Sequence, residues 1–188
     1  HGERVFDQMT HLAKIFSNTL GGILVDDNRV PLSDSGIQKS KQQLVEIQSR
    51  SGGVGLNLSS LRPRGARVKK VNGTSSGPVT WAGLFSYATH DVVQQGGTRR
   101  GATMLMLWDW HPDIEEFITV KEDLSKINGA NLSVCVSDSF MEAVKADGDW
   151  QLVYPDLDDP MYDDKWDGDL ETWKKLGEQL LLKYMDGV

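Results

Sequence analysis

The chain has 188 residues, of which 39% are hydrophobic and 25% charged, and this length suffices for one sizeable globular core or a large piece of a bigger one. Its net charge of −7 argues against general nucleic-acid binding. The single cysteine, Cys135, excludes an internal disulfide and a metal site built from a cysteine cluster, and it favours a reducing compartment. No window has the apolar length of a membrane span, so we predict a cytoplasmic protein that binds neither membrane nor nucleic acid.

The first part of the chain predicts two helices and then a strand. Apolar residues at helical spacing predict a helix over residues 3–16. A second helix is predicted over 34–50, with Ser33 or Asp34 as its N-cap and a thin apolar stripe formed by Ile37, Leu44 and Ile47. Such a polar helix is typical of an interface or an edge rather than of a core. A short strand is expected over 54–61, where apolar and polar residues alternate.

The rest of the chain alternates between helical and extended patterns. Pro78 lies in the first turn of one predicted helix, Pro112 opens the next, and Asp138 is the predicted N-cap of the third. Alternation of this kind predicts an α/β fold with a largely parallel sheet. The predicted helices cover residues 76–95, 111–122, 138–147 and 169–185, and the predicted strands cover 102–110, 131–137 and 150–156.

The stretch from Ser49 to Trp81 concentrates glycines, hydroxyls and cations. Glycine lets a backbone approach a ligand closely, and clustered cations suit an anionic partner such as a nucleotide phosphate. The segment "GGVG" resembles the start of a dinucleotide-binding fingerprint, but Leu58 stands where the third glycine belongs and no helix follows, which argues against that fold. Five cations lie within nine residues of this stretch, namely Arg62, Arg64, Arg67, Lys69 and Lys70.

Other motifs are explained at least as well without a ligand. The segment "GGTRRGA" lacks the ending of a phosphate-binding loop, which leaves Arg99 and Arg100 as solvated turn residues or ligand contacts with equal weight. His111 is predicted to begin a helix rather than to bind a metal, and Cys135 lies in an apolar strand that predicts a buried, unreactive thiol. The acid-rich "DLDDPMYDDKWDGD" lacks the residue order of a calcium loop, and no metal site is predicted.

Six segments, taken in order and at their spacing, resemble the catalytic core of adenosylcobalamin-dependent ribonucleotide reductase: "SGGVGLNLSSLRPRGARV", "NGTSSGPVTW", "QGGTRRGATMLML", "WHPDIEEFI", "NGANLSVCVSDSFMEAVKADGDWQLVYPD" and "YDDKWDGDLETWKK". The resemblance implies an α/β fold in which residues 33–188 form the first part of a ten-stranded barrel with an effector-binding helical pair. Residues 1–32 would then be an N-terminal helical segment and a shortened connector.

The resemblance also implies a reaction and its partners. Members of the family reduce ribonucleotides to deoxyribonucleotides through a cysteine thiyl radical, with adenosylcobalamin as cofactor and a deoxynucleoside triphosphate effector that selects the substrate base. It further implies a homodimer that pairs the helices at 34–50 and 77–95.

The family's motifs carry specific residues over to this chain. The effector-binding residues would be Asp34, Ser35, Arg62 and Lys69. The turn whose backbone lies against the substrate would contain Ser51, Gly52 and Gly53. The loop that relays effector identity to the substrate would contain Lys126, Asn128 and Asn131.

Two cysteine motifs of the family have no counterpart in this sequence. The redox cysteine expected near Asp26 to Arg29 is absent, and so is the motif that bears the radical cysteine. We therefore expect the chain alone to be inactive, as a fragment or split subunit completed by a reductase chain that carries the radical cysteine. A non-catalytic nucleotide-binding regulatory module is the first alternative, and a structural protein that uses only the helical pair to dimerise is the second.

Overall fold

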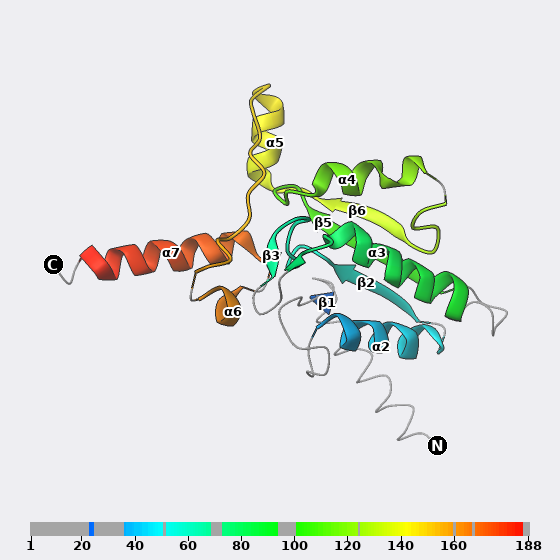
Figure 1. The fold of residues 1–188 in the computed structure, drawn as a ribbon. Helices are drawn as coiled ribbons and strands as arrows, with labels where there is room; N and C mark the ends of the chain where they lie inside the picture. Colours follow the sequence, from blue (N-terminus) through cyan, green and yellow to red (C-terminus); the bar gives the residue numbers. More distant parts are fainter. Residues whose placement is uncertain are drawn as a thin grey trace, which may run out of the picture.

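A parallel β-sheet organises the chain in the computed structural model, which describes residues 23–24, 36–50, 52–68, 73–93, 101–123, 125–159, 161–166 and 168–185. Its strands are β1 (Ile23–Leu24), β2 (Gly53–Asn57), β5 (Ala102–Trp108) and β6 (Asn131–Cys135), in the spatial order β1-β2-β5-β6 (Figure 1). All three pairings between them are parallel, which confirms the predicted sheet type. The helix predicted at 3–16 and the predicted caps Ser33 and Asp34 lie outside the described residues.

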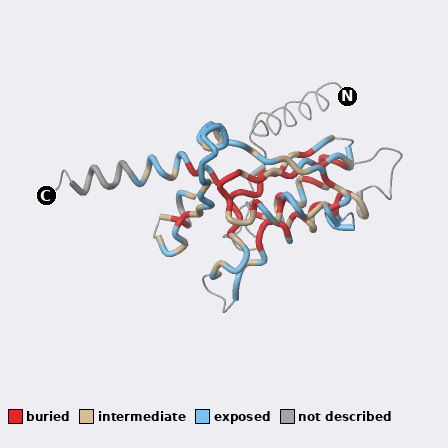
Figure 2. The backbone as a smooth tube through the Cα atoms, turned by 90° about the horizontal axis from the view of Figure 1, so that it is seen from above, coloured by how far each residue is buried: buried red, intermediate tan, exposed pale blue. Residues whose placement is uncertain are grey.

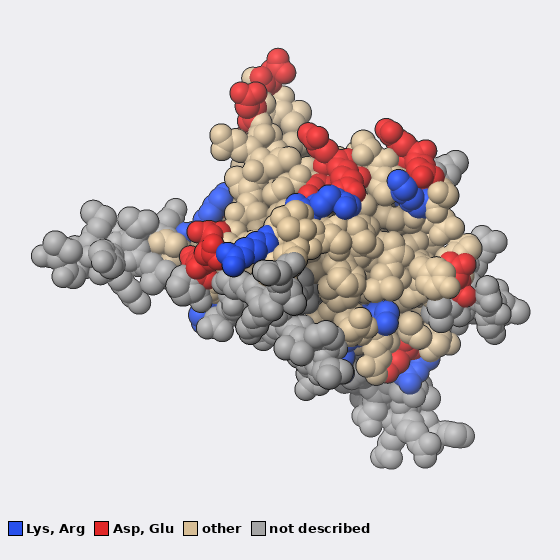
Figure 3. All heavy atoms as spheres, viewed as in Figure 1, with Lys and Arg blue, Asp and Glu red and all other residues tan. Residues whose placement is uncertain are grey.

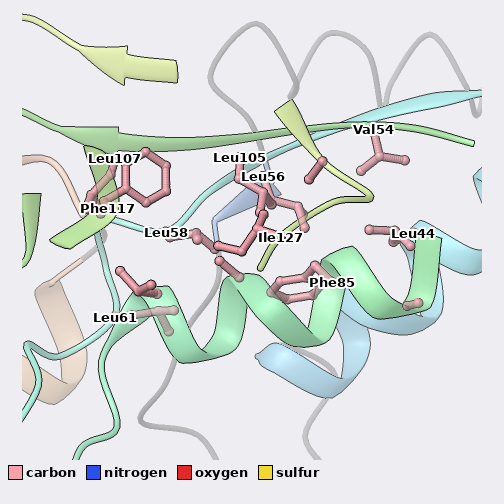
Figure 4. Close-up of a cluster of buried hydrophobic side chains, with 14 of the residues drawn as sticks. Leu44, Val54, Leu56, Leu58, Leu61, Phe85, Leu105, Leu107, Phe117 and Ile127 are labelled. Atoms are coloured by element: carbon pink, nitrogen blue, oxygen red, sulfur yellow. The ribbon is translucent and has the colours of Figure 1, made fainter. Parts of the chain in front are cut away.

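Three helices cover one face of this sheet: α2 (Ile37–Gln48), α3 (Pro78–Tyr87) and α4 (Ile114–Thr119). Pro78 is in the first turn of α3, as predicted, because its ring fixes a helical φ and its missing N–H is not needed there. Between the helices and the sheet lies one core of fully buried side chains (Figure 4), among them Leu44, Leu56, Phe85, Leu105, Leu107 and Phe117. Burial of this apolar surface is the main force that holds the layers together.

The opposite face of the sheet stays open across the described strands. Side chains alternate along a strand, so the partners in register share a face. Met104, which pairs with Gly55 and Asn131, is 39% exposed, whereas Leu105 beside it is fully buried on the helix side. Parallel sheets are normally covered on both faces, so this face is the one that would line the interior of a barrel.

The apolar stripe of α2 faces inward, which corrects the prediction that it lies at an interface. Leu44 is fully buried and Ile47 is 6% exposed, and both belong to the core. The outward positions of the helix, such as Gln42 and Glu46, are polar and bond to each other at 2.9 Å. The stripe is thin because only one side of the helix touches the sheet.

Helix α3 ends earlier than predicted and continues as a π-helix, η1 (Ala88–Val93). Thr89 in this π-helix is fully buried, and its hydroxyl forms a hydrogen bond with the Thr103 hydroxyl at 2.7 Å. Gln48 at the end of α2 donates to the same Thr103 hydroxyl at 2.6 Å and to the Ala102 carbonyl at 3.1 Å. A buried polar chain therefore ties α2, β5 and η1 together, a feature that hydrophobic periodicity does not reveal.

The remaining helices and strands lie outside the four-stranded sheet. The 3-10 helix η3 (Val120–Glu122) extends α4, and the antiparallel hairpin of β3 (Arg67–Val68) and β4 (Gly73–Thr74) was not predicted. After β6 come α5 (Asp138–Lys145), α6 (Tyr162–Lys165) and α7 (Leu170–Met185). Helices α5 and α7 project from the body of the molecule (Figure 1), and exposed residues predominate along α5 and the start of α7 (Figure 2).

Two local predictions for this part are wrong. Ser137, not Asp138, is the N-cap of α5, because its hydroxyl accepts from the Phe140 N–H at 3.2 Å. Residues 150–156 form no strand: Trp150 and Tyr154 bond to loops through their side chains, and the Val153 N–H donates to the Trp110 carbonyl at 2.8 Å. The alternation of apolar residues in this segment reflects packing on neighbouring loops rather than a ladder.

Candidate nucleotide site

The loop of residues 58–64 follows the carboxyl end of β2 and carries the first predicted phosphate-binding arginine. Three successive carbonyls of this loop accept hydrogen bonds from side chains far away in sequence: Ser60 from Tyr154 and Trp166, Leu61 from His111, and Arg62 from Ser75. These tertiary contacts add to the local turn of the loop, in which the Leu61 N–H donates to the Leu58 carbonyl at 3.0 Å.

Arg62, the predicted effector contact, has its side chain largely buried. It is 5% exposed, and its guanidinium carbon lies 5.7 Å from the centre of the Tyr162 ring. A guanidinium over a tyrosine face is stabilised by the ring quadrupole. A phosphate can therefore reach Arg62 only at the small part of the side chain that stays accessible, and its effector role remains a prediction.

Arg64 has the opposite environment. Its side chain is 49% exposed and makes two hydrogen bonds to the Glu116 carboxylate, at 2.9 and 2.6 Å. The hydrogen bond to Glu116 raises the pKa of Arg64 further, so the side chain is always charged. Its backbone N–H donates to Asp113 at 2.7 Å, and Gly77, with φ +80°, packs so closely that an added Cβ would lie 2.8 Å from the same carboxylate oxygen.

A cavity of about 460 Å³ lies beside α3 and brings predicted site residues together. Lys126 and Asn128, from the loop predicted to relay effector identity, line it together with Arg64 and the 60% exposed Tyr87. An aromatic ring, an amide and two cations are groups that recognise a base and a phosphate. Two carboxylates, those of Asp91 and Glu116, also line the cavity, and Thr80 and Ser86 add hydroxyls.

The loop of residues 126–131, which is predicted to relay effector identity, is held against α3 by a close backbone contact. Gly129 donates its N–H to the Ser86 hydroxyl at 2.8 Å, and a Cβ at Gly129 would lie 2.3 Å from the Ser86 carbonyl, so no larger residue fits. Ile127 adopts φ +47°, an uncommon conformation for a β-branched residue, while its side chain is buried in the core (Figure 4). Burial of Ile127 offsets this backbone strain and leaves Asn128 exposed beside it.

Gly52 and Gly53, predicted to touch substrate, differ in what the fold demands of them. A Cβ at Gly52 would lie 2.6 Å from the Ile47 side chain, so packing of α2 requires a glycine there. A Cβ at Gly53 would meet only Ala102, at an ordinary 3.7 Å. Gly53 shares the open face of the sheet with Gly55, and Asn131 lies on the same face at the start of β6. Packing therefore does not explain why residue 53 is a glycine. A ligand that approaches the backbone at this position would explain it.

The remaining predicted site residues, Asp34, Ser35, Ser51 and Lys69, lie outside the described residues. The predicted cation cluster is dispersed where the structure describes it. Arg62 is buried, Arg64 is paired with Glu116, and Arg67 is exposed on β3. Figure 3 shows acidic side chains gathered over α4 and α5, with lysine and arginine atoms scattered between them.

His111, which the sequence pattern predicted only as the first residue of a helix, is a buried residue with two hydrogen bonds. It is fully buried, and its Nδ1 accepts from the Asp113 N–H at 3.1 Å. The neutral ring must therefore carry its proton on Nε2, which lies 2.9 Å from the Leu61 carbonyl and donates to it. Burial lowers the pKa of His111 to about 4, partly offset by the Leu61 hydrogen bond. The helix itself begins three residues later, at Ile114.

Cys135 ends β6 beside Trp108 and is half-buried. Burial, and secondarily the charge of Asp109, raises the pKa of its thiol. A thiol that resists ionisation is a poor nucleophile, in agreement with the unreactive thiol predicted from the sequence.

A larger cavity, of about 600 Å³, opens beyond the carboxyl ends of β5 and β6, between the starts of α5 and α7. Its walls contain Trp108, Trp110 and Trp150, four carboxylates (Asp138, Asp149, Asp169 and Glu171) and one lysine, Lys174.

None of the helices in the described residues is long and apolar enough to cross a membrane.

Comparisons with known proteins agree with this architecture. The family profile "Ribonucleotide reductase, barrel domain" matches residues 24–182, and a second profile, "ZipA, C-terminal FtsZ-binding domain", matches residues 1–43, most of which lie outside the described residues. The open parallel sheet with helices on one face is what a part of an α/β barrel shows before closure.

Several relatives are reductases. The vitamin B12-dependent ribonucleoside-diphosphate reductase of Mycobacterium tuberculosis is 43% identical over 142 residues, which cover 74% of this chain and 20% of the relative. The Thermoplasma acidophilum enzyme of the same name is 32% identical over 191 residues, covering 82% and 25%. The large subunit of the Dictyostelium discoideum ribonucleoside-diphosphate reductase is 35% identical over 127 residues, covering 65% and 15%. The chain thus spans between about a seventh and a quarter of these relatives, and it belongs to the ribonucleotide reductase barrel-domain family.

Proposed function

We propose that this chain is part of a ribonucleotide reductase that converts ribonucleoside diphosphates to deoxyribonucleotides, and that it contributes the deoxynucleotide effector site and part of the substrate pocket. Membership of the family supports the reaction class, and the names of the relatives support diphosphate substrates. The assignment of particular residues rests on the geometry beside α3.

The observation that carries the effector site is the meeting of Lys126 and Asn128 with Arg64 and Tyr87 around one cavity. The resemblance assigns Lys126 and Asn128 to the relay loop, and the fold places them next to a cation and an exposed ring. A triphosphate bound there would compete with Glu116 for the Arg64 guanidinium, while Tyr87 offers a face for the base. The other proposed effector contacts are Asp34, Ser35, Arg62 and Lys69, of which Arg62 does not line this cavity.

The substrate part of the proposal concerns the open face of the sheet. Gly53 and Gly55 leave the backbone of β2 accessible there, and Gly53 has room for a Cβ that the sequence does not use. Ser51, Gly52 and Gly53 would let the substrate lie directly against main-chain donors and acceptors. Asn131 lies on the same face, so this residue would connect the relay loop to the substrate.

Neither of the two cavities described above fits the adenosylcobalamin that the family implies. The larger cavity is the only one of the two with aromatic walls on several sides, but four carboxylates against one lysine line it. The phosphodiester of the cofactor would meet repulsion there. We therefore derive no step through cobalamin from this chain.

The sequence contains neither the redox cysteine expected near Asp26 to Arg29 nor the radical cysteine motif, so we propose that turnover requires a complementary reductase chain that carries the radical cysteine. With adenosylcobalamin, a dithiol and ribonucleotides, the chain alone is expected to form no deoxyribonucleotide. The second candidate, a non-catalytic nucleotide-binding regulatory module, is favoured by the same missing cysteines.

We also propose a two-fold homodimer through the helices at 34–50 and 77–95, as the family resemblance implies. The inward apolar stripe of α2 means that this contact would use polar residues of α2 and the exposed ring of Tyr87. Sedimentation with and without nucleotide tests it: a monomer at micromolar concentration under both conditions contradicts the dimer.

Titration calorimetry with the four common deoxynucleoside triphosphates tests the effector site. A charge-assisted contact to arginine is worth about 1.5–3 kcal/mol, so Arg62→Ala is expected to weaken binding by about ten- to a hundred-fold. Lys126→Ala removes a point charge and is expected to cost about five-fold. Because Arg62 is buried, Arg62→Lys and a far-ultraviolet spectrum distinguish a lost phosphate contact from a lost fold.

Lys145 supplies the matched control, because it is an exposed cation on α5 that does not line the cavity beside α3. Lys145→Ala is expected to leave the affinity unchanged. If no triphosphate binds below millimolar concentration, or if Lys145→Ala weakens binding as much as Lys126→Ala, the proposed effector site is wrong.

A further inference from the structure

The loop of residues 58–64 is held by a hydrogen-bonded aromatic group from the carboxyl-terminal part of the chain. The Tyr154 hydroxyl donates to the Ser60 carbonyl at 2.6 Å, and the Trp166 indole N–H lies 3.2 Å from the same carbonyl. About a hundred residues of sequence separate these partners, so the contact is made only when the fold is complete.

The donors and acceptors in this group are mutually consistent. The single Tyr154 proton is used on Ser60, so the Tyr154 oxygen acts as acceptor for the Trp166 indole at 3.0 Å and for the Tyr162 hydroxyl at 3.0 Å. The one indole N–H of Trp166 is shared between this oxygen and the Ser60 carbonyl. A phenolic oxygen has the two lone pairs that this requires. Tyr162 is fully buried, and its ring lies below the Arg62 guanidinium.

Close packing adds to the hydrogen bonds. Gly168, with φ +91°, lies so near the loop that a Cβ there would be 3.1 Å from the Ser60 Cβ and 3.2 Å from the Ser60 nitrogen. Trp173 packs edge-on against Tyr162 and Trp166, with ring centres 6.4 and 5.8 Å apart. The aromatic group therefore packs against the loop at Ser60, shortly before Arg62 and Arg64.

We propose that Tyr154 and Trp166 are positioning residues, which fix the Ser60 carbonyl and so hold Arg62 and Arg64 in the conformation that binds nucleotide. The inference rests on the proposed effector function of this loop. Neither ring lines the cavity beside α3, so they act through the backbone and not by contact with the ligand. The segment after β6 thereby sets the affinity of a site that it does not enter.

Hydrogen exchange of the peptide covering residues 58–66, followed by mass spectrometry on the whole chain, tests the positioning without any ligand. Tyr154→Phe and Trp166→Phe keep a ring but remove the donor. Loss of one partly buried hydrogen bond is expected to raise the exchange rate of this peptide about three- to ten-fold. Nucleotide affinity, measured on the same variants with the triphosphate that binds the unsubstituted chain best, is expected to fall by a similar factor.

Trp173→Phe is the matched control, because Trp173 belongs to the same aromatic group and its ring packs on Tyr162 and Trp166 rather than on the loop. It is expected to lower the unfolding temperature without changing loop exchange relative to the rest of the chain. A second control, Trp150→Phe, removes an indole donor to the Asp109 carbonyl away from the loop.

The outcomes separate the two proposals. Unchanged loop exchange in both variants overturns the positioning role, and so does unchanged affinity when the unsubstituted chain binds nucleotide. Loop exchange that rises in Tyr154→Phe and Trp166→Phe but not in the controls supports the positioning of the loop. If in that case no triphosphate binds to the unsubstituted chain, the effector function fails and the structural hold on the loop stands.

Discussion

Protonation of His111 is expected to destabilise the fold as the pH falls below neutrality. The ring is fully buried, donates from Nε2 to the Leu61 carbonyl and accepts at Nδ1 from the Asp113 N–H. A second proton would have to sit on Nδ1, where it would face that N–H. Protonation therefore breaks one hydrogen bond and leaves a charge buried between the two loops.

The magnitude follows from the pKa. Burial lowers the pKa of His111 from 6.5 to about 4, and at 1.36 kcal/mol per unit this difference corresponds to about 3 kcal/mol. Because the folded-state value lies below the unfolded one, the contribution is complete above about pH 6.5. It is lost progressively as the pH falls from 6.5 to about 4, and it does not change further below that.

The assay is urea unfolding followed by tryptophan fluorescence at pH 7, 6, 5 and 4.5, for the chain and for His111→Gln. Glutamine can still donate to Leu61 but does not titrate. The variant is expected to be less stable at pH 7, and the gap to narrow by about 1.4 kcal/mol per pH unit below 6.5. Asp113, whose pKa burial raises, titrates in both proteins and cancels in the difference. Parallel pH profiles would refute the reasoning.

Three further outcomes follow from the packing. Thr103→Val removes the hydroxyl that accepts from Gln48, and we expect a loss of about 1–3 kcal/mol in urea unfolding; an unchanged midpoint would contradict the buried polar chain. Gly77→Ala forces a side chain into a left-handed position and a crowded site, so we expect at least about 1–2 kcal/mol of destabilisation, and a stable alanine variant would count against the close approach seen here. Arg64→Met breaks an exposed pair with Glu116, and calorimetric unfolding should show at most about 1 kcal/mol; a larger loss would mean that the pair is structural.

The sequence was sufficient to predict the parallel sheet and its helices, because their signal is periodic and strong. β5 is a nearly continuous apolar run, and Pro78 marks the start of α3 at a residue that the structure reproduces. The strand at 150–156 was predicted from the same alternation and is wrong, since Trp150 and Tyr154 bond to loops rather than to a neighbouring strand. Local pattern does not distinguish these two uses of alternating residues.

The candidate site was predictable only in part, for a similar reason. Family motifs indicated Lys126 and Asn128, and the fold brings both to one cavity. The same motifs indicated Arg62 as a phosphate contact, which stays a prediction, and tertiary packing buries most of its side chain against an aromatic ring supplied by α6. The burial of His111 depends on the 58–64 loop lying over it, which no spacing in the sequence encodes.

The outer edge of strand β6 affects how the protein behaves in concentrated solution. Among the described strands it is the outer one on its side of the sheet, and Val134 within it and Val136 just after it are 36% and 50% exposed. An uncovered edge with apolar neighbours is a template for pairing with another extended chain, and α5 beside it buries none of its residues. Without a covering partner, aggregation through this edge is expected to increase with protein concentration and with salt, because salt screens the repulsion between chains of net charge −7.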